Sequence, residues 1–277
     1  MSSRSAPLNP DSLLPQVSVA RPRLLVSVRN VEEASAALAG GCDILDLKEP
    51  DRGSLGRPAD ETVVEVAAWL QQSAPHIPLS AALGEARDWL ADAGQLPGAA
   101  VSSLAFVKLG CAGIVGNDWL RKWNEARRRA VSPAENPRWI AVAYADWREA
   151  DAPTPAEIIT GAIAEQCAGV LFDTFHKDGR TLFDYLDDDE LTEAVATVQN
   201  AGLLVALAGG LLLREVPRAA SFSPDVIAVR TAACRAGRRN APIATAAVRE
   251  LRQTIETTPI NANVRQAGVL GRDASGD

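Results

Sequence analysis

The sequence predicts a single-domain α/β fold, a closed (β/α)₈ barrel, and three observations support this. Eight short apolar runs recur along the chain, and each is followed by a helix or a helix-like stretch. The runs are almost continuously apolar, as expected for parallel strands that are buried on both faces. The length of 277 residues is also usual for such a barrel. A doubly wound open sheet is the alternative, but it normally carries a GxGxxG turn after an early strand, and we find none.

The eight strands are expected where β-branched and other apolar residues cluster between turn-forming residues. Pro50 limits the second strand, because proline cannot donate to a ladder and forces the preceding residue into an extended conformation. The expected strands are residues 23–28, 43–48, 78–84, 105–110, 139–146, 169–173, 203–208 and 225–230.

Helices are expected between the strands, and several have recognisable ends. Asn30 is a plausible N-cap and Gly40-Gly41 a stop for the first helix. Thr154 with Glu157 resembles a capping box, and an acidic run at 187–190 suits the positive end of a helix dipole. The expected helices are residues 31–39, 58–72, 117–131, 154–167, one opened by the acidic run, and 242–254, with a loop and short helix in 85–103.

The predicted barrel occupies residues 23–257, between a flexible N-terminal extension (1–22) and a flexible C-terminal tail (258–277). The net charge of -7 argues against non-specific nucleic-acid binding. No apolar run approaches the length of a membrane span, and the N-terminus lacks a secretory core, so we expect a cytoplasmic protein. The four cysteines are scattered, which favours reduced thiols over a zinc site.

Candidate functional residues lie at the carboxyl ends of the strands, where barrel active sites are built. Lys48 ends the second strand, and Asp46 shares its face because side chains alternate along a strand. A buried amine can lose its charge and attack a carbonyl. Lys48 is therefore a candidate nucleophile, although an isolated lysine at a strand end is more often simply solvated.

Other ionisable residues share this rim: Lys108 on the fourth strand, Asp146 on the fifth, and Asp173 with Lys177 at the sixth. Several ammonium groups in one pocket lower each other's pKa, which favours a neutral amine. One lysine can form an imine while the other moves protons, and Asp46 and Asp173 can position them or act as acid and base. A buried ion-pair network without catalysis is the alternative.

A phosphate site is predicted after the seventh and eighth strands, where barrels often bind phosphate. Gly209 and Gly210 allow close backbone approach, and Arg230 followed by Thr231 supplies a charged partner. A tight turn would explain the two glycines equally well. The arginine cluster at 235–240 is interpreted as a solvated basic loop that adds positive potential near the mouth. We find no metal-ligand set and predict no catalytic metal.

An ordered set of motifs between residues 23 and 255 resembles the (5-formylfuran-3-yl)methyl phosphate synthase family, the lysine-dependent barrel of methanofuran biosynthesis. The motifs are LVS (25–27), AGG (39–41), DILDLKEP (43–50), GSLG (53–56), VKLG (107–110), YAD (144–146), DT (173–174) with KDG (177–179), TLFD (181–184), LAG (207–209) and VR (229–230) with AAC (232–234).

The resemblance implies a TIM-like barrel that condenses two glyceraldehyde 3-phosphate molecules, with loss of phosphate and water, to 4-(hydroxymethyl)-2-furancarboxaldehyde phosphate. Lys48 matches the family's Schiff-base lysine and Lys108 its proton-accepting lysine. Asp46, Asp173 and Lys177 match other active-site positions. Ser27 lies at the end of the first strand, and we include it with the substrate-binding residues. No organic or metal cofactor is implied beyond the covalent imine on Lys48.

Two alternatives stay open. One is another class I Schiff-base aldolase that acts on a phosphosugar. The other is a non-catalytic barrel that binds a phosphometabolite. The expected partner in each case is a small phosphorylated molecule, and the sequence leaves the oligomeric state open, with a homo-oligomer as one option.

Overall fold

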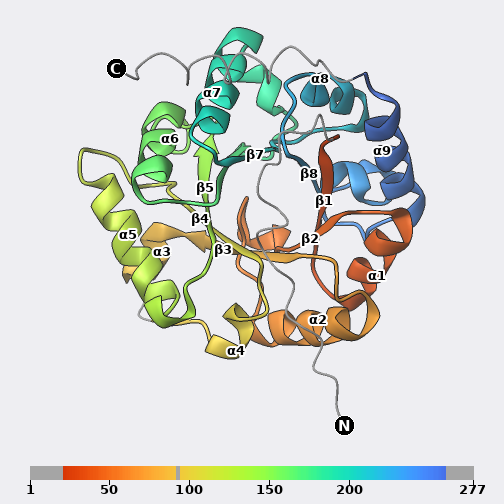
Figure 1. The fold of residues 1–277 in the computed structure, drawn as a ribbon, viewed down its shortest axis with the longest axis horizontal. Helices are drawn as coiled ribbons and strands as arrows, with labels where there is room; N and C mark the ends of the chain where they lie inside the picture. Colours follow the sequence, from red (N-terminus) through yellow and green to blue (C-terminus); the bar gives the residue numbers. More distant parts are fainter. Residues whose placement is uncertain (1–20, 92–93, 260–277) are drawn as a thin grey trace, which may run out of the picture.

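The strands of the computed structural model close into a ring that the helices surround (Figure 1). The structure describes residues 21–91 and 94–259. All neighbouring strands pair in parallel, and β1 pairs with β8 to complete the barrel. The strands are β1 (Arg23–Val28), β2 (Ile44–Leu47), β3 (Leu79–Glu85), β4 (Phe106–Gly110), β5 (Trp139–Tyr144), β6 (Gly169–Asp173), β7 (Leu204–Leu207) and β8 (Val226–Val229). The predicted fold class is confirmed.

The helices pack around the outside of the barrel (Figure 1). They are α1 (Val31–Gly40), α2 (Asp60–Ser73), α3 (Ala86–Ala91), α4 (Gly98–Val101), α5 (Trp119–Ala130), α6 (Pro155–Ala164), α7 (Asp188–Asn200), α8 (Val216–Ser221) and α9 (Thr245–Thr257). The capping box that opens α6 is present, since Thr154 Oγ1 accepts from Glu157 N and the Glu157 carboxylate accepts from Thr154 N.

Several ends of helices and strands differ from the sequence-based prediction by one to three residues. The last helix begins at Thr245 instead of 242, because Ile243 forms an antiparallel bridge with Cys234 and holds this segment extended. The helix expected from residue 58 begins at Asp60, after an extended Ala59. The fifth strand ends at Tyr144, and Asp146 lies in the turn that follows. The predicted terminal segments 1–22 and 258–277 lie almost entirely outside the described residues.

The alternation of side chains along each strand divides the apolar core into two parts. In β1, Leu24 and Val26 point outward into a large cluster shared by strands and helices. Leu25 points inward and belongs to a smaller cluster inside the barrel, together with Ile44 and Phe106. The inward positions at the carboxyl ends are polar: Ser27, Asp46, Lys108 and Asp173 are all buried. The barrel interior is therefore polar at the carboxyl ends and mainly apolar in the layer below them, while Arg23 and Asp225 line the cavity at the amino ends.

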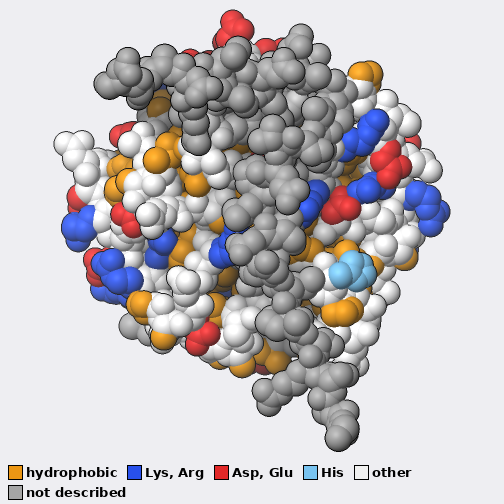
Figure 2. Space-filling view, viewed as in Figure 1, with side chains coloured by type: hydrophobic (Ala, Val, Ile, Leu, Met, Phe, Trp, Pro, Cys, Tyr) orange, Lys and Arg blue, Asp and Glu red, His pale blue; other side chains and the backbone are white. Residues whose placement is uncertain are grey.

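Apolar and charged side chains are interspersed over the part of the surface that the described residues form in Figure 2. Within the described ranges, none of the helices combines the length and hydropathy needed to cross a membrane.

Candidate active site

A cavity of about 300 Å³ lies inside the barrel and reaches the carboxyl ends of the strands. Its lining includes ten of the residues that the sequence analysis placed at the site, all but Asp146: Ser27, Asp46, Lys48, Lys108, Asp173, Lys177, Gly209, Gly210, Arg230 and Thr231. The structure thus brings all ten together, and their individual roles stay predictions. Three of the chain's four lysines line this one cavity.

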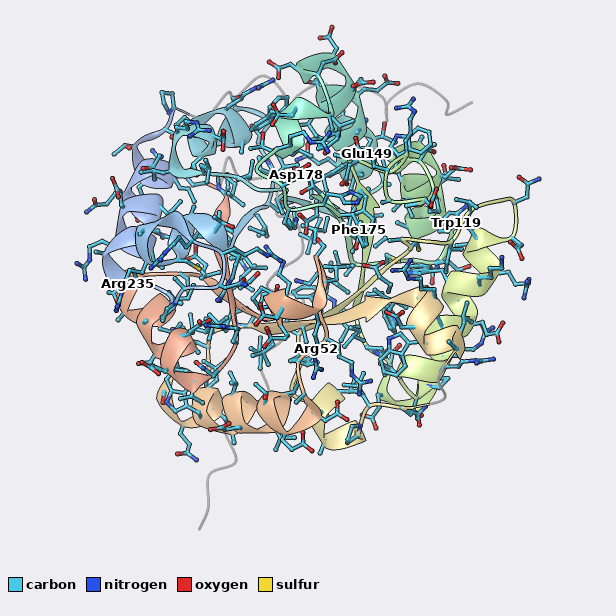
Figure 3. The ribbon with its side chains drawn as sticks, turned by 180° about the vertical axis from the view of Figure 1, so that it is seen from behind. Arg52, Trp119, Glu149, Phe175, Asp178 and Arg235 are labelled. Carbon is cyan, nitrogen blue, oxygen red and sulfur yellow. The ribbon has the colours of Figure 1, made fainter. Side chains whose placement is uncertain are left out.

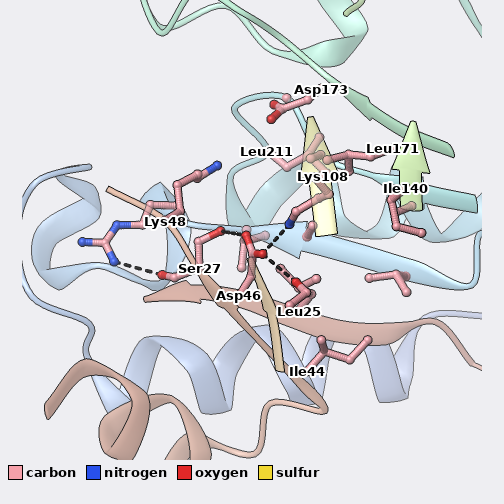
Figure 4. A pocket seen from close by; sticks show the side chains of 18 of the residues that line it. Leu25, Ser27, Ile44, Asp46, Lys48, Lys108, Ile140, Leu171, Asp173 and Leu211 are labelled. Atoms are coloured by element: carbon pink, nitrogen blue, oxygen red, sulfur yellow. Dashed lines mark hydrogen bonds and ion pairs between the residues drawn. The ribbon is translucent and has the colours of Figure 1, made fainter. Parts of the chain in front are cut away.

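Asp46 is the centre of a polar cluster in the middle of the barrel. Its carboxylate accepts hydrogen bonds from Ser27 Oγ at 3.1 Å and Ser80 Oγ at 2.6 Å, and it pairs with the Lys108 ammonium (Figure 4). Burial opposes the charged carboxylate, but the charges of Lys108 and Lys48 outweigh it and lower the pKa of Asp46. Asp46 is therefore ionised, and it fixes Lys108 through a charge-assisted hydrogen bond.

Asp173 organises a second cluster nearer the mouth. The Lys177 Nζ donates to its carboxylate at 2.7 Å and also to the Thr174 carbonyl at 2.6 Å. Ser54 Oγ, from the loop after β2, reaches Asp173 at 3.3 Å and the same carbonyl at 2.8 Å. Burial alone would raise the pKa of Asp173, but the positive charges of Lys177 and Lys48 outweigh burial and lower the pKa to about 2. The loops after β2 and β6 are thereby joined across the mouth.

Lys48 lies between these two clusters and belongs to neither. Its backbone N–H continues the ladder to the Val28 carbonyl at 3.1 Å, and its side chain projects toward the space beneath Asp173 (Figure 4). Among the described residues, its Nζ forms no hydrogen bond or ion pair within the usual limits. Burial, Lys177 and Arg239 lower the pKa of Lys48 to about 7, although Asp173 and Asp46 oppose the shift. A substantial fraction of this amine is neutral at physiological pH.

The glycines after β7 are required by the close approach of another loop. Gly209 and Gly210 have positive φ values of 86° and 65°, and the Gly209 carbonyl accepts from Leu182 N at 2.7 Å. A Cβ on Gly210 would lie 2.8 Å from the Arg180 carbonyl oxygen. The tight-turn interpretation therefore accounts for the geometry of both glycines, and phosphate binding by them stays a prediction.

Arg230 lines the cavity, but its guanidinium is already surrounded by acceptors. It pairs with both carboxylate oxygens of Glu33 in α1, and its Nη1 donates to the Ser27 carbonyl at 2.9 Å. Its Nε donates to the Arg239 carbonyl at 3.1 Å. In this structure Arg230 ties β8 to α1 and to the following loop, so its predicted contact with phosphate would require it to give up a partner.

Asp146, which the sequence places on the same rim, faces away from the cavity. Its carboxylate accepts from the backbone N–H groups of Phe175 and His176 at 2.7 and 2.8 Å. In Figure 3, which shows the molecule from behind, Phe175 and Asp178 lie near Glu149 of the loop after β5. Asp146 therefore orders the loop after β6. Asp146, Glu149 and His176 bring ligand atoms within 4.8 Å of one another, but Glu149 is bound to Arg180 and Asp146 to the backbone.

Sequence reasoning missed the residues that complete the site. Ser54 donates a hydrogen bond to Asp173, and Ser80 donates one to Asp46. The only sequence signal for these contacts was that Ser80 lies on an expected strand and Ser54 in the loop after one.

A buried pair outside the cavity lining was missed as well. Tyr144 Oη donates to Glu85 Oε1 at 2.6 Å, and burial raises the pKa of Glu85 to about 7. Both side chains fill the space beside Gly110, where a Cβ would lie 2.2 Å from Glu85 Oε2.

The fold and the cavity define a (β/α)₈-barrel protein whose central cavity is lined by three lysines and two ionised carboxylates. Solved structures share the fold. Thiamine phosphate pyrophosphorylase from Pyrococcus furiosus superposes with a TM-score of 0.54 at 15% identity, covering 85% of this chain and 95% of that chain. A 3-hexulose-6-phosphate synthase gives 0.53 at 17% identity, covering 84% and 99%.

The sequence comparisons are more specific. The family model for 4-HFC-P synthase matches residues 24–252. The (5-formylfuran-3-yl)methyl phosphate synthase of Methanopyrus kandleri is 33% identical over 222 residues, covering 79% of this chain and 92% of that protein. The synthase of the same name from Methanococcus maripaludis is 36% identical over 228 residues, with the same coverage. The chain belongs to the 4-HFC-P synthase family and is an enzyme, which confirms the resemblance found in the motifs.

Proposed function

We propose that this enzyme condenses two glyceraldehyde 3-phosphate molecules to 4-(hydroxymethyl)-2-furancarboxaldehyde phosphate, through an imine on Lys48 and without a further cofactor. The product would serve methanofuran-type C1 carrier biosynthesis. The balance of the reaction is two triose phosphates in, and one furan phosphate, one inorganic phosphate and two water molecules out. Family membership supports the product, and the geometry of the cavity supports the route.

The observation that carries the route is the environment of Lys48. Its Nζ is buried, it has no carboxylate partner among the described residues, and its pKa is lowered to about 7. A neutral amine can add to the substrate carbonyl, and loss of water then gives the imine, which makes the adjacent carbon acidic. Lys108 and Lys177 each have a carboxylate partner instead, so they suit proton transfer and charge stabilisation.

The proposed roles of Lys108 and Lys177 follow from their carboxylate partners. Asp46 holds the Lys108 ammonium near the middle of the barrel, where it can exchange a proton with the carbon beside the imine. Lys177, held by Asp173 near the mouth, can donate to an oxygen that leaves as water or phosphate. Each lysine is placed by a separate carboxylate, so the two proton transfers do not compete for one group.

The test is reductive trapping. The protein is incubated with glyceraldehyde 3-phosphate and borohydride, and the modified residue is mapped by mass spectrometry. Parallel samples without borohydride are followed for free phosphate and for a furan chromophore in the ultraviolet. We expect an adduct on Lys48 together with both products. Lys48→Gln should lose the adduct and turnover, whereas Lys122→Gln, at the lysine outside the cavity, should keep both.

The other outcomes separate the alternatives. An adduct on Lys48 without phosphate release would identify an ordinary class I aldolase. An unmodified protein that still binds the sugar phosphate but makes no product would contradict the catalytic role of Lys48 and favour a phosphometabolite-binding barrel.

A further inference from the structure

Two arginines, Arg230 and Arg239, line the cavity near the carboxyl ends of the strands, and Arg239 is the one of these two without a carboxylate partner in the described structure. It lies in the loop between β8 and α9, is half-buried, and lines the same cavity as Lys48, Gly209 and Gly210. Its Nη2 donates to the Gly53 carbonyl at 3.2 Å. In the described part of the chain it has no ion pair, whereas Arg230 pairs with Glu33.

The backbone around Arg239 is held on both sides. Arg230 Nε donates to the Arg239 carbonyl at 3.1 Å, and Arg230 Nη2 reaches the Ala241 carbonyl at 3.4 Å. Asn240 Nδ2 donates to Asp51 Oδ1 at 2.8 Å, which joins this loop to the loop after β2. The Arg239 side chain therefore extends across the mouth from a backbone that is held by hydrogen bonds. Little conformational freedom is then lost when the guanidinium binds a ligand.

The charges around the mouth favour an anion. Lys48, Lys177 and Arg239 lie close enough to Asp173 to interact with it, and each of the three carries a positive charge when protonated. A guanidinium presents parallel N–H donors that match the oxygens of a phosphate, and desolvation strengthens such contacts. Gly209 and Gly210 line the same cavity.

We propose that Arg239 binds the phosphate group of the phosphorylated substrate and sets the preference for phosphomonoesters, while Arg230 acts through it as a positioning residue. This inference rests on the proposed function for the identity of the substrate. It assigns the role of charged phosphate partner to Arg239, in the loop after β8, instead of to Arg230 at the end of the strand.

The experiment measures binding without turnover. Glycerol 3-phosphate carries the phosphate but has no carbonyl, so it cannot form an imine, and glycerol serves as the probe without phosphate. Calorimetric titration of the full chain should show that Arg239→Gln weakens glycerol 3-phosphate binding on the order of 10- to 100-fold, because a hydrogen-bonded charge is lost. Arg239→Lys should give an intermediate loss, since charge remains but the bidentate geometry does not.

Arg238→Gln is the matched control. It removes the same charge from the neighbouring, exposed position of the same loop, which is outside the cavity lining. Its affinity should equal that of the wild type. If Arg239→Gln folds poorly, as judged by circular dichroism, Arg239→Lys decides the question through its own loss of affinity.

Equal affinity in the wild type and both Arg239 variants would overturn the inference, as would a wild type that does not bind glycerol 3-phosphate. An equal loss in Arg238→Gln would show a general charge effect and also overturn it. Failure of the proposed function looks different. In that case phosphate binding would still depend on Arg239, but borohydride would trap no adduct on Lys48.

Discussion

At the scale of single residues, the site depends on how three lysines share two carboxylates. Lys108 is paired with Asp46 and Lys177 with Asp173, while Lys48 has no such partner in the described structure. Alternation along β2 was enough to predict that Asp46 and Lys48 share a face. It could not show that Ser54, from a loop, and Ser80, from the next strand, would hold the carboxylates, because those contacts come from chain folding.

The reactivity of Lys48 should therefore depend on pH near neutrality. A pKa of about 7 means that the amine is protonated below pH 7 and becomes a nucleophile above it. Asp173→Asn removes a negative charge that stabilises the ammonium, so its labelling profile should shift to lower pH. The measurement is the rate of Lys48 acetylation by acetic anhydride across pH, followed by mass spectrometry.

Asp189→Asn, in the exposed first turn of α7, is the control and should leave the profile unchanged. A midpoint near the usual lysine pKa of about 10.4 in the wild type would contradict the assignment of Lys48 as the neutral amine.

At the scale of elements, sequence patterns predicted the existence and order of strands and helices better than their ends. The capping box of α6 was found because both of its partners are local. The start of α9 was missed because Ile243 is held by a bridge to Cys234, which is formed by the fold of the loop and leaves no helix-stop signal in the sequence. Packing between helices can also require glycine at a position where the sequence indicates only the end of a helix.

Gly40 at the end of α1 is such a case. A Cβ at this position would lie 2.5 Å from Val248 Cβ and 2.9 Å from the Thr245 carbonyl oxygen, both in α9. Gly40→Ala should lower the free energy of unfolding by roughly 1–3 kcal/mol, because the two helices must move apart. Urea denaturation measures this. Gly94→Ala, where a Cβ has open space, should change it little, and equal effects of the two substitutions would argue against the helix contact as the cause.

At the scale of the whole molecule, the barrel is closed by contacts between the two ends of the described chain. β1 pairs with β8, and α1 packs against α9. Within this seam Glu33 of α1 is buried and bonds both Arg230 of β8's end and Arg29 after β1. The charges of Arg230 and Arg29 outweigh burial and lower the pKa of Glu33, so it is ionised.

Removing this carboxylate should weaken the closure of the barrel. Glu33→Gln leaves the Arg230 guanidinium buried without its counter-charge, and we expect a loss of roughly 3–5 kcal/mol in the free energy of unfolding, measured in urea. Glu32→Gln, the exposed neighbour in the same helix turn, should change it by less than about 0.5 kcal/mol. A small loss at Glu33 would mean that the backbone carbonyls alone satisfy Arg230.

The sequence by itself determined the barrel, the strand order and ten of the residues that line the cavity. These follow from local information: apolar runs, the two-residue period of strands, and the rule that carboxyl ends of parallel strands meet at one face. Only the tertiary structure decided how the charges are partnered. In the described structure, Arg230 pairs with Glu33, Arg239 lines the cavity, and Lys48 has no carboxylate partner. These outcomes depend on distances between side chains far apart in the chain.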